Sequence, residues 1–161
     1  MRTVKENDSL GLFCGACTLV INVKKSIDPS SIATNVLNIM GVSEGNQNDK
    51  IGQISTDANG NRILIEFVEP LPDDKYTLTL SETVLDQEGN TLIGNTDIQL
   101  SVLTGNVNAD TIVNVGDMIG VRAHIGMPID EETVKYDINQ DGNINVGDLI
   151  SIRARSGNTL P

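Results

Sequence analysis

The feature that most constrains this chain is a repeat in its last third. Residues 106–119 align without gaps to residues 137–150, at an offset of 137 − 106 = 31 residues. In each copy, Asn- and Asp-rich positions run into an Asn-Val-Gly-Asp segment, and apolar residues at helical spacing follow. Each copy ends on a glycine, Gly126 or Gly157, as helices commonly do. A repeat of this length predicts two copies of one loop–helix unit.

The second copy follows the pattern of an EF-hand calcium loop. Such a loop offers side-chain oxygens at positions one, three and five, a backbone carbonyl at seven, a further ligand at nine and a carboxylate at twelve. The matching residues are Asp137, Asn139, Asp141, Asn143, Asn145 and Asp148. Gly142 stands at position six, where the loop turns sharply. Asp148 is one methylene shorter than the usual Glu, so a bidentate grip requires the next helix to lie closer.

The first copy predicts a weaker calcium site. Its matching residues are Asn106, Asn108, Asp110, Ile112, Asn114 and Asp117. Asn106 replaces the leading carboxylate, and Thr111 stands where glycine is expected, although a β-branched residue resists positive φ. We therefore expect two Ca²⁺ sites, with the second stronger than the first.

The alternative is that both copies are metal-free turns rich in Asn and Asp. Residues 57–61, Asp-Ala-Asn-Gly-Asn, have the composition of such a turn. They have no closing carboxylate and no helical pattern after them, so we interpret them as a hairpin turn.

The chain before the repeat has a β pattern. Runs rich in branched residues occupy residues 19–23, 63–68, 76–80 and 98–102, and turn-forming segments separate them. With no Trp, two Phe and two Tyr, the core must consist mainly of Val, Ile and Leu. This spacing of short strands predicts a small antiparallel β-sandwich.

Both parts resemble known families. Residues 26–32, 70–78 and 84–92 are similar to segments of bacterial Ig-like domains, and residues 104–161 resemble a dockerin type I module. The resemblance implies a mainly β Ig-like sandwich followed by a small all-α dockerin of two calcium loop–helix F-hand repeats. The implied divisions are an N-terminal tail or partial strand over 1–17, the sandwich over 18–103 and the dockerin over 104–161. A short connecting helix is expected over 128–134, with Asp130 as its N-cap.

The resemblance also implies a function. Dockerins are calcium-dependent interaction modules that attach a parent protein to a cohesin-type β-sandwich, in some cases in polysaccharide metabolism. We expect a non-catalytic secreted or cell-surface bacterial protein, monomeric when unbound, although no export signal is evident in the chain. The alternative is a calcium-stiffened stalk or adhesive region, with the dockerin packed on its own Ig-like domain.

Helical spacing separates two stripes on each repeat helix. The predicted core stripe contains Met118, Val121, Ile125, Leu149 and Ile152. The other stripe and its small neighbours lie where the dockerin family contacts its partner: Val115, Gly116, Ile119, Arg122, Ala123, Val146, Gly147, Ile150, Arg153 and Ala154. The near identity of the copies raises the hypothesis of docking in two orientations. The alternative is that Ile119 and Ile150 belong to the core.

Composition excludes several other classes of function. The net charge of −11 disfavours nucleic acid and anionic membranes, and no apolar run is long enough to span a bilayer. His124 is the only histidine and the carboxylates are accounted for as ligands or turns, so we identify no nucleophile–His–acid set; we expect His124 to be a solvent-exposed helix residue. Cys14 and Cys17 lack the further ligands that a zinc site needs and are interpreted as a local disulfide or free thiols.

Overall fold

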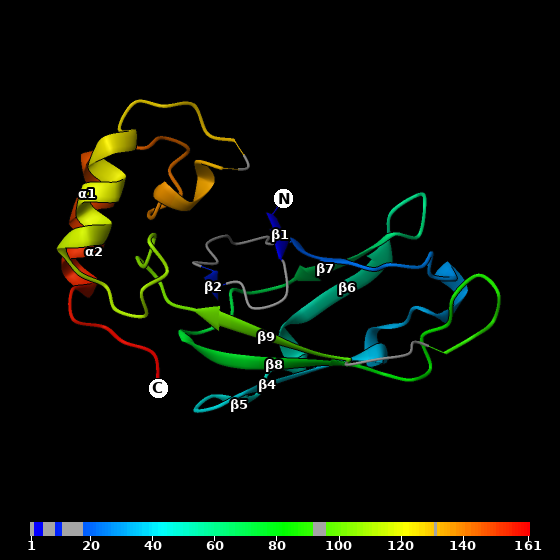
Figure 1. Ribbon diagram of the computed structural model, residues 1–161. Helices are drawn as coiled ribbons and strands as arrows, with labels where there is room; N and C mark the ends of the chain where they lie inside the picture. Colours follow the sequence, from blue (N-terminus) through cyan, green and yellow to red (C-terminus); the bar gives the residue numbers. More distant parts are fainter. Residues whose placement is uncertain (1, 5–8, 11–17, 92–95, 131) are drawn as a thin grey trace.

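The computed structural model describes residues 2–4, 9–10, 18–91, 96–130 and 132–161, and Cys14 and Cys17 lie outside them. Most of this chain is a β-sandwich, with one sheet in the order β1-β3-β7-β6 and the other in the order β2-β9-β8-β4-β5 (Figure 1). The strands are β1 (Arg2–Val4), β2 (Ser9–Leu10), β3 (Thr18–Asn22), β4 (Leu37–Gly41), β5 (Gly45–Asn46), β6 (Ile51–Thr56), β7 (Arg62–Phe67), β8 (Asp74–Leu80) and β9 (Asp97–Val102). All pairings are antiparallel except β1 with β3 and β2 with β9.

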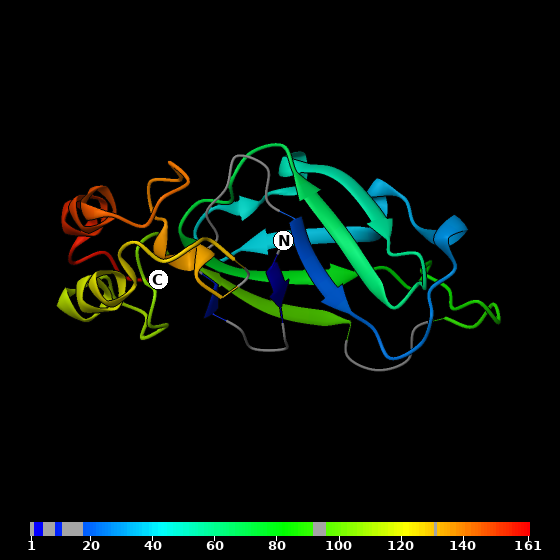
Figure 2. The ribbon, with the colours of Figure 1, turned by 90° about the horizontal axis from the view of Figure 1, so that it is seen from above.

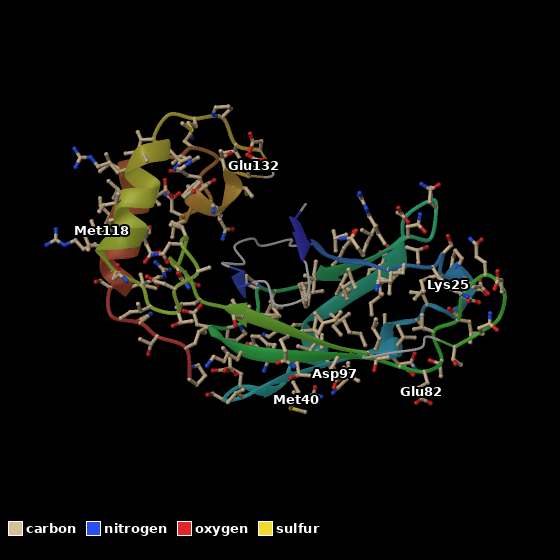
Figure 3. The ribbon with its side chains drawn as sticks, viewed as in Figure 1. Lys25, Met40, Glu82, Asp97, Met118 and Glu132 are labelled. Atoms are coloured by element: carbon tan, nitrogen blue, oxygen red, sulfur yellow. The ribbon has the colours of Figure 1, made fainter. Side chains whose placement is uncertain are left out.

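Alternating side chains build the core between the two sheets. In β4 every second residue is buried, and β8 alternates in the same way. Ile39, Ile63, Ile65 and Leu78 are fully enclosed, so branched aliphatic residues supply most of this core. Met40, on the other side of β4, projects from the outer face of its sheet (Figure 3).

Short 3-10 turns and side-chain contacts close the end of the sandwich far from the C-terminal region. The turns at this end are η1 (Pro29–Ser31) and η2 (Thr34–Val36), whereas a third, η3 (Asn48–Lys50), packs against β4 and directly precedes β6. The buried Asp86 carboxylate accepts hydrogen bonds from the backbone N–H groups of Glu88 and Asn90 and from Lys25 Nζ at 3.0 Å. The hydrogen bond from the backbone N–H of Asn90 makes the largest contribution, and that from the Lys25 ammonium the next largest. Together they hold the pKa of the Asp86 carboxyl well below its usual value.

We expect Asp86 to make the sandwich acid-sensitive. Because its pKa is lower in the folded state, its stabilising contribution is full above the unfolded pKa of about 3.9 and is lost as pH falls below it. Asp86→Asn should therefore have a flatter profile of unfolding free energy between about pH 5 and pH 2. Urea denaturation at several pH values measures this, and parallel profiles for the two proteins would contradict it.

The C-terminal region, residues 103–161, is not the all-α module that the family resemblance implied. Its described regular structure consists of α1 (Val115–His124), α2 (Val146–Arg155) and the 3-10 turn η4 (Val134–Tyr136), and loops form the rest. The expected fold class is wrong on this point. The residues between these elements form loops, because side-chain carboxylates such as those of Asp117, Asp130 and Asp148 bind their backbone N–H groups.

A second core lies under the two helices and is separate from the core of the sandwich. It consists of Leu103, Val107, Val113, Val121, Ile138, Ile144 and Ile152. Met118, Leu149 and Leu160 pack against it, whereas Ile125, predicted to be core, follows α1 and is exposed. Five of these seven buried residues lie outside the helices, so the loops supply most of this core. No helix in the described residues is long and apolar enough to cross a membrane.

Two further expectations between the repeats are wrong. Of the helix expected over 128–134, the described residues up to 133 form none and only Val134 is helical, as the first residue of η4, although the Asp130 carboxylate does accept the backbone N–H groups of Glu132 and Thr133. His124 is half-buried rather than exposed, because its ring stacks on Tyr136 with 3.7 Å between ring centroids. The Tyr136 ring therefore covers the C-terminal end of α1.

Candidate metal centre

The two repeat copies adopt the same loop–helix geometry. Each helix begins at a capping box, in which the side chain of Asn114 or Asn145 accepts an N–H of the first turn. In return, Asp117 or Asp148 accepts the backbone N–H of that Asn at 2.8 Å. The Asn-Val-Gly-Asp segment is thus the local signal that begins each helix, because it satisfies amides that would otherwise lack partners.

Asp148 holds its loop to its helix. The carboxylate is fully buried; one oxygen accepts the backbone N–H groups of Ile138 at 2.6 Å and Asn139 at 3.1 Å, and the other accepts that of Asn145. In the first copy Asp117 binds Val107, Asn108 and Asn114 in the same way. Sequence reasoning assigned these residues to the metal alone and missed this structural role.

Asp137 has an unsatisfied oxygen inside the second loop. Its Oδ2 accepts the backbone N–H of Gly142 at 3.0 Å, but Oδ1 is buried and has no hydrogen-bond partner. It is the only such side-chain atom in the part of the chain that the structure describes. A buried, unpartnered carboxylate oxygen is costly unless a cation or donor satisfies it. The second loop therefore fits a hard cation at the position where the sequence predicts the first ligand.

Neighbouring amide side chains surround the next predicted ligand. Asp141 accepts Asn139 Nδ2 at 2.9 Å and Asn145 Nδ2 at 3.1 Å, and its other oxygen accepts the backbone N–H of Asn143. The Asn139 and Asn145 amides lower the pKa of the Asp141 carboxyl, so it is charged at neutral pH. Five predicted ligands, Asp137, Asn139, Asp141, Asn143 and Asn145, thus line one loop, and Ca²⁺ accepts such carboxylate, amide and carbonyl oxygens.

The first loop has the same shape but satisfies itself more fully. Asn106 is buried, and its Oδ1 accepts the backbone N–H of Asp110 at 3.3 Å. Asn108 Nδ2 donates to Asp110 at 2.8 Å, and this bond followed by the Ile112 N–H lowers the pKa of the Asp110 carboxyl. No described atom of this loop resembles the unpartnered oxygen of Asp137.

Carboxylates alone do not form either centre. Among the described residues, no three His, Cys, Asp or Glu side chains converge on one point. Any cation must therefore also bind Asn side chains and backbone carbonyls, which are the oxygen ligands predicted for both loops. Both oxygens of Asp117 and Asp148 already accept backbone N–H groups, so they would bind a cation only through their remaining lone pairs.

Position six is left-handed in both loops. Gly142 has φ 83°, and Thr111 has φ 75° despite its β-branched side chain. The residues at position four, Ala109 and Gln140, also have positive φ, which the sequence did not indicate.

We expect Thr111→Gly to stabilise the protein by about 1 kcal/mol, because it removes the strain of a β-branched residue in this conformation. Gly142→Thr should destabilise it by a similar amount. Chemical denaturation in the absence of calcium measures both, and a destabilising Thr111→Gly would contradict the expectation.

The outer stripe of each helix is exposed. Val115 and Ile119 of α1 are 68% and 63% exposed, and Val146 and Ile150 of α2 are 61% and 64% exposed. The alternative that Ile119 and Ile150 belong to the core is therefore wrong. Arg122, Ala123, Arg153 and Ala154 are also exposed, whereas Gly116 and Gly147 are half-buried beside Asn108 and Asn139.

Comparisons with known proteins establish no family for this chain. Neither models of protein families nor curated proteins give a match. A cryo-EM structure of E. coli alpha-2-macroglobulin aligns with a TM-score of 0.45 at 16% identity, over 61% of this chain and 6% of that one. A chain of a type II cohesin–X-dockerin complex from Acetivibrio cellulolyticus aligns with a TM-score of 0.33 at 14% identity, over 88% of this chain and 96% of that one. Neither similarity is strong enough to assign a function.

Proposed function

We propose that the C-terminal region is a calcium-dependent interaction region of the dockerin type, carried on a β-sandwich spacer. The observation that carries the calcium proposal is the buried, unpartnered Oδ1 of Asp137 inside an EF-hand-like loop. The second loop would hold the tighter ion through Asp137, Asn139, Asp141, Asn143 and Asn145. The first loop would hold a weaker one, because Asn106 brings no charge and its oxygen already has a partner.

Calcium would act here on structure rather than on chemistry. A bound cation satisfies the Asp137 oxygen and favours the folded loop, and α2 begins at the same loop. At about a hundred times its dissociation constant, such an ion would stabilise the region by roughly 2.7 kcal/mol. Isothermal titration of metal-stripped protein with calcium, with circular dichroism on the same samples, tests this. Absence of binding would overturn the calcium proposal.

The partner surface would be the exposed stripe of the two helices. Val115, Ile119, Val146 and Ile150 present apolar area to solvent, and Arg122 and Arg153 follow on the same stripe. Arginine is enriched among the residues that contribute most to protein interfaces. A cohesin-type β-sandwich is the partner that the family resemblance implies.

We expect the double variant Ile119→Asp, Ile150→Asp to lose cohesin binding while it keeps its calcium affinity, because both side chains are solvent-exposed and lie outside the loops. The measurement is capture by purified, immobilised type I and type II cohesin domains, in calcium and in chelator. Capture that is unchanged in the variant would refute this surface.

A calcium-stiffened stalk is the second candidate, and specific contacts favour it. Asp73 Oδ1, just before β8, accepts both the backbone N–H and the hydroxyl of Thr104, at 2.8 and 2.7 Å. Lys75 Nζ donates to the carbonyl of Pro161. Calcium-dependent stability without capture by any cohesin domain would favour the stalk.

A further inference from the structure

The two loops differ in how the rest of the chain supports them. Position eight of each loop is bonded to the segment after the opposite helix: Gly157 N–H donates to Val113 O at 2.8 Å, and Gly126 N–H donates to Ile144 O at 2.9 Å. These crossed bonds require α1 and α2 to run in opposite directions, and the two helices lie side by side (Figure 2). In these two hydrogen bonds the two copies are equivalent.

Beyond that shared bond, the C-terminal tail supports the first loop alone. Val113 N–H donates to Asn158 O at 2.9 Å, and Leu160 N–H donates to Thr111 O at 3.4 Å. Ile112 and Thr159 form an antiparallel bridge between these bonds, and the Leu160 side chain packs against the second core. For the second loop, the described residues after Gly126 supply no further backbone bond.

The sandwich also contacts the chain just before the first loop. The double contact of Asp73 with Thr104 lies two residues before the loop begins at Asn106. Leu103, the residue after β9, is buried in the second core. The tail that pairs with the loop returns to β8 at its end, where Lys75 meets Pro161. Figure 1 shows the C-terminus beside the ends of β8 and β9.

We propose that the sandwich and the C-terminal tail together brace the first loop, so that it keeps its closed shape without a cation, and that calcium controls the shape of the second loop only. The first loop lacks the leading carboxylate and has no unpartnered oxygen, so its fold creates no need for an ion. The second loop buries the Asp137 oxygen and lacks the brace. The brace of the first loop goes beyond the proposed function and does not require calcium to bind, whereas the part about the second loop rests on the proposed calcium function.

Amide hydrogen exchange followed by NMR on the full chain tests the proposal. Gly157 and Gly126 are matched reporters, since they occupy the same position in the two copies and donate to equivalent carbonyls. In chelator, we expect the Gly157 amide to exchange at least about tenfold more slowly than the Gly126 amide. Equal rates, or faster exchange at Gly157, would overturn the proposal. Failure of calcium to slow exchange at Gly126 would instead count against the proposed calcium function.

Two variants identify the source of the protection. Deletion of residues 158–161 should bring exchange at Gly157 to the rate of Gly126 in chelator. The double variant Asp73→Ala, Lys75→Ala keeps the tail and should raise exchange at Gly157 several-fold, with Gly126 unchanged. If the Gly157 amide still exchanged slowly in both variants, no brace would exist. This conclusion would not depend on whether the deletion also loosens the helices.

Discussion

Asp137→Asn should weaken calcium binding at the second loop by at least about tenfold, which corresponds to about 1.4 kcal/mol. The substitution places in the second loop the residue that the first loop has naturally. It removes one negative charge and the buried oxygen that has no partner in the loop. The amide can still accept the Gly142 N–H with its own oxygen, as Asn106 accepts that of Asp110. The loop should therefore keep its shape.

The reciprocal substitution is the control. Asn106→Asp gives the first loop the leading carboxylate, and we expect its calcium affinity to rise toward that of the second. Calorimetric titration of both metal-stripped variants and the double variant separates the two sites. If Asp137→Asn left the calcium affinity of both loops unchanged, the second loop would not be the tighter site. The proposal that the unpartnered Oδ1 of Asp137 binds a cation would then be wrong.

Asp148→Asn should destabilise the C-terminal region by about 3 kcal/mol even when no calcium is present. An Asn oxygen can replace the carboxylate oxygen that accepts the Ile138 and Asn139 amides. Its Nδ2 would then face the backbone N–H of Asn145, so two donors would meet in a buried site. The loss of the capping bond also weakens the start of α2.

Asp141→Asn is the matched control for this prediction. Asp141 is exposed and is a predicted ligand in the same loop, so the substitution should weaken calcium binding but change the unfolding free energy in chelator much less than Asp148→Asn does. Urea denaturation followed by circular dichroism, with amide exchange at Ile138 and Asn139, compares the two. If Asp148→Asn were no more destabilising than Asp141→Asn in chelator, Asp148 would serve as a ligand alone.

Local pattern was sufficient for the strands with strong alternation. The segments predicted at 19–23, 63–68, 76–80 and 98–102 are β3, β7, β8 and β9, with ends shifted by at most two residues. Sequence reasoning missed β4, β5 and β6. In β4, Asn38 and Gly41 dilute the apolar signal, and in β6 the register shifts between Ile51 and Gln53, around Gly52. Such strands form because their neighbours offer an edge to pair with, which is not a local property.

The internal repeat predicted two loop–helix units, and the structure has both. The alternating polar positions and the capping box of each copy are local features of the chain, so the sequence contains their signal, although the capping role of Asp117 and Asp148 was missed. Tertiary structure alone decided that Asp148 also binds the backbone amides of Ile138 and Asn139, that Ile119 and Ile150 are exposed, and that Asp137 keeps an oxygen without a hydrogen-bond partner. It also decided which loop the C-terminal tail supports, because partners and burial depend on segments that meet only after the chain has folded.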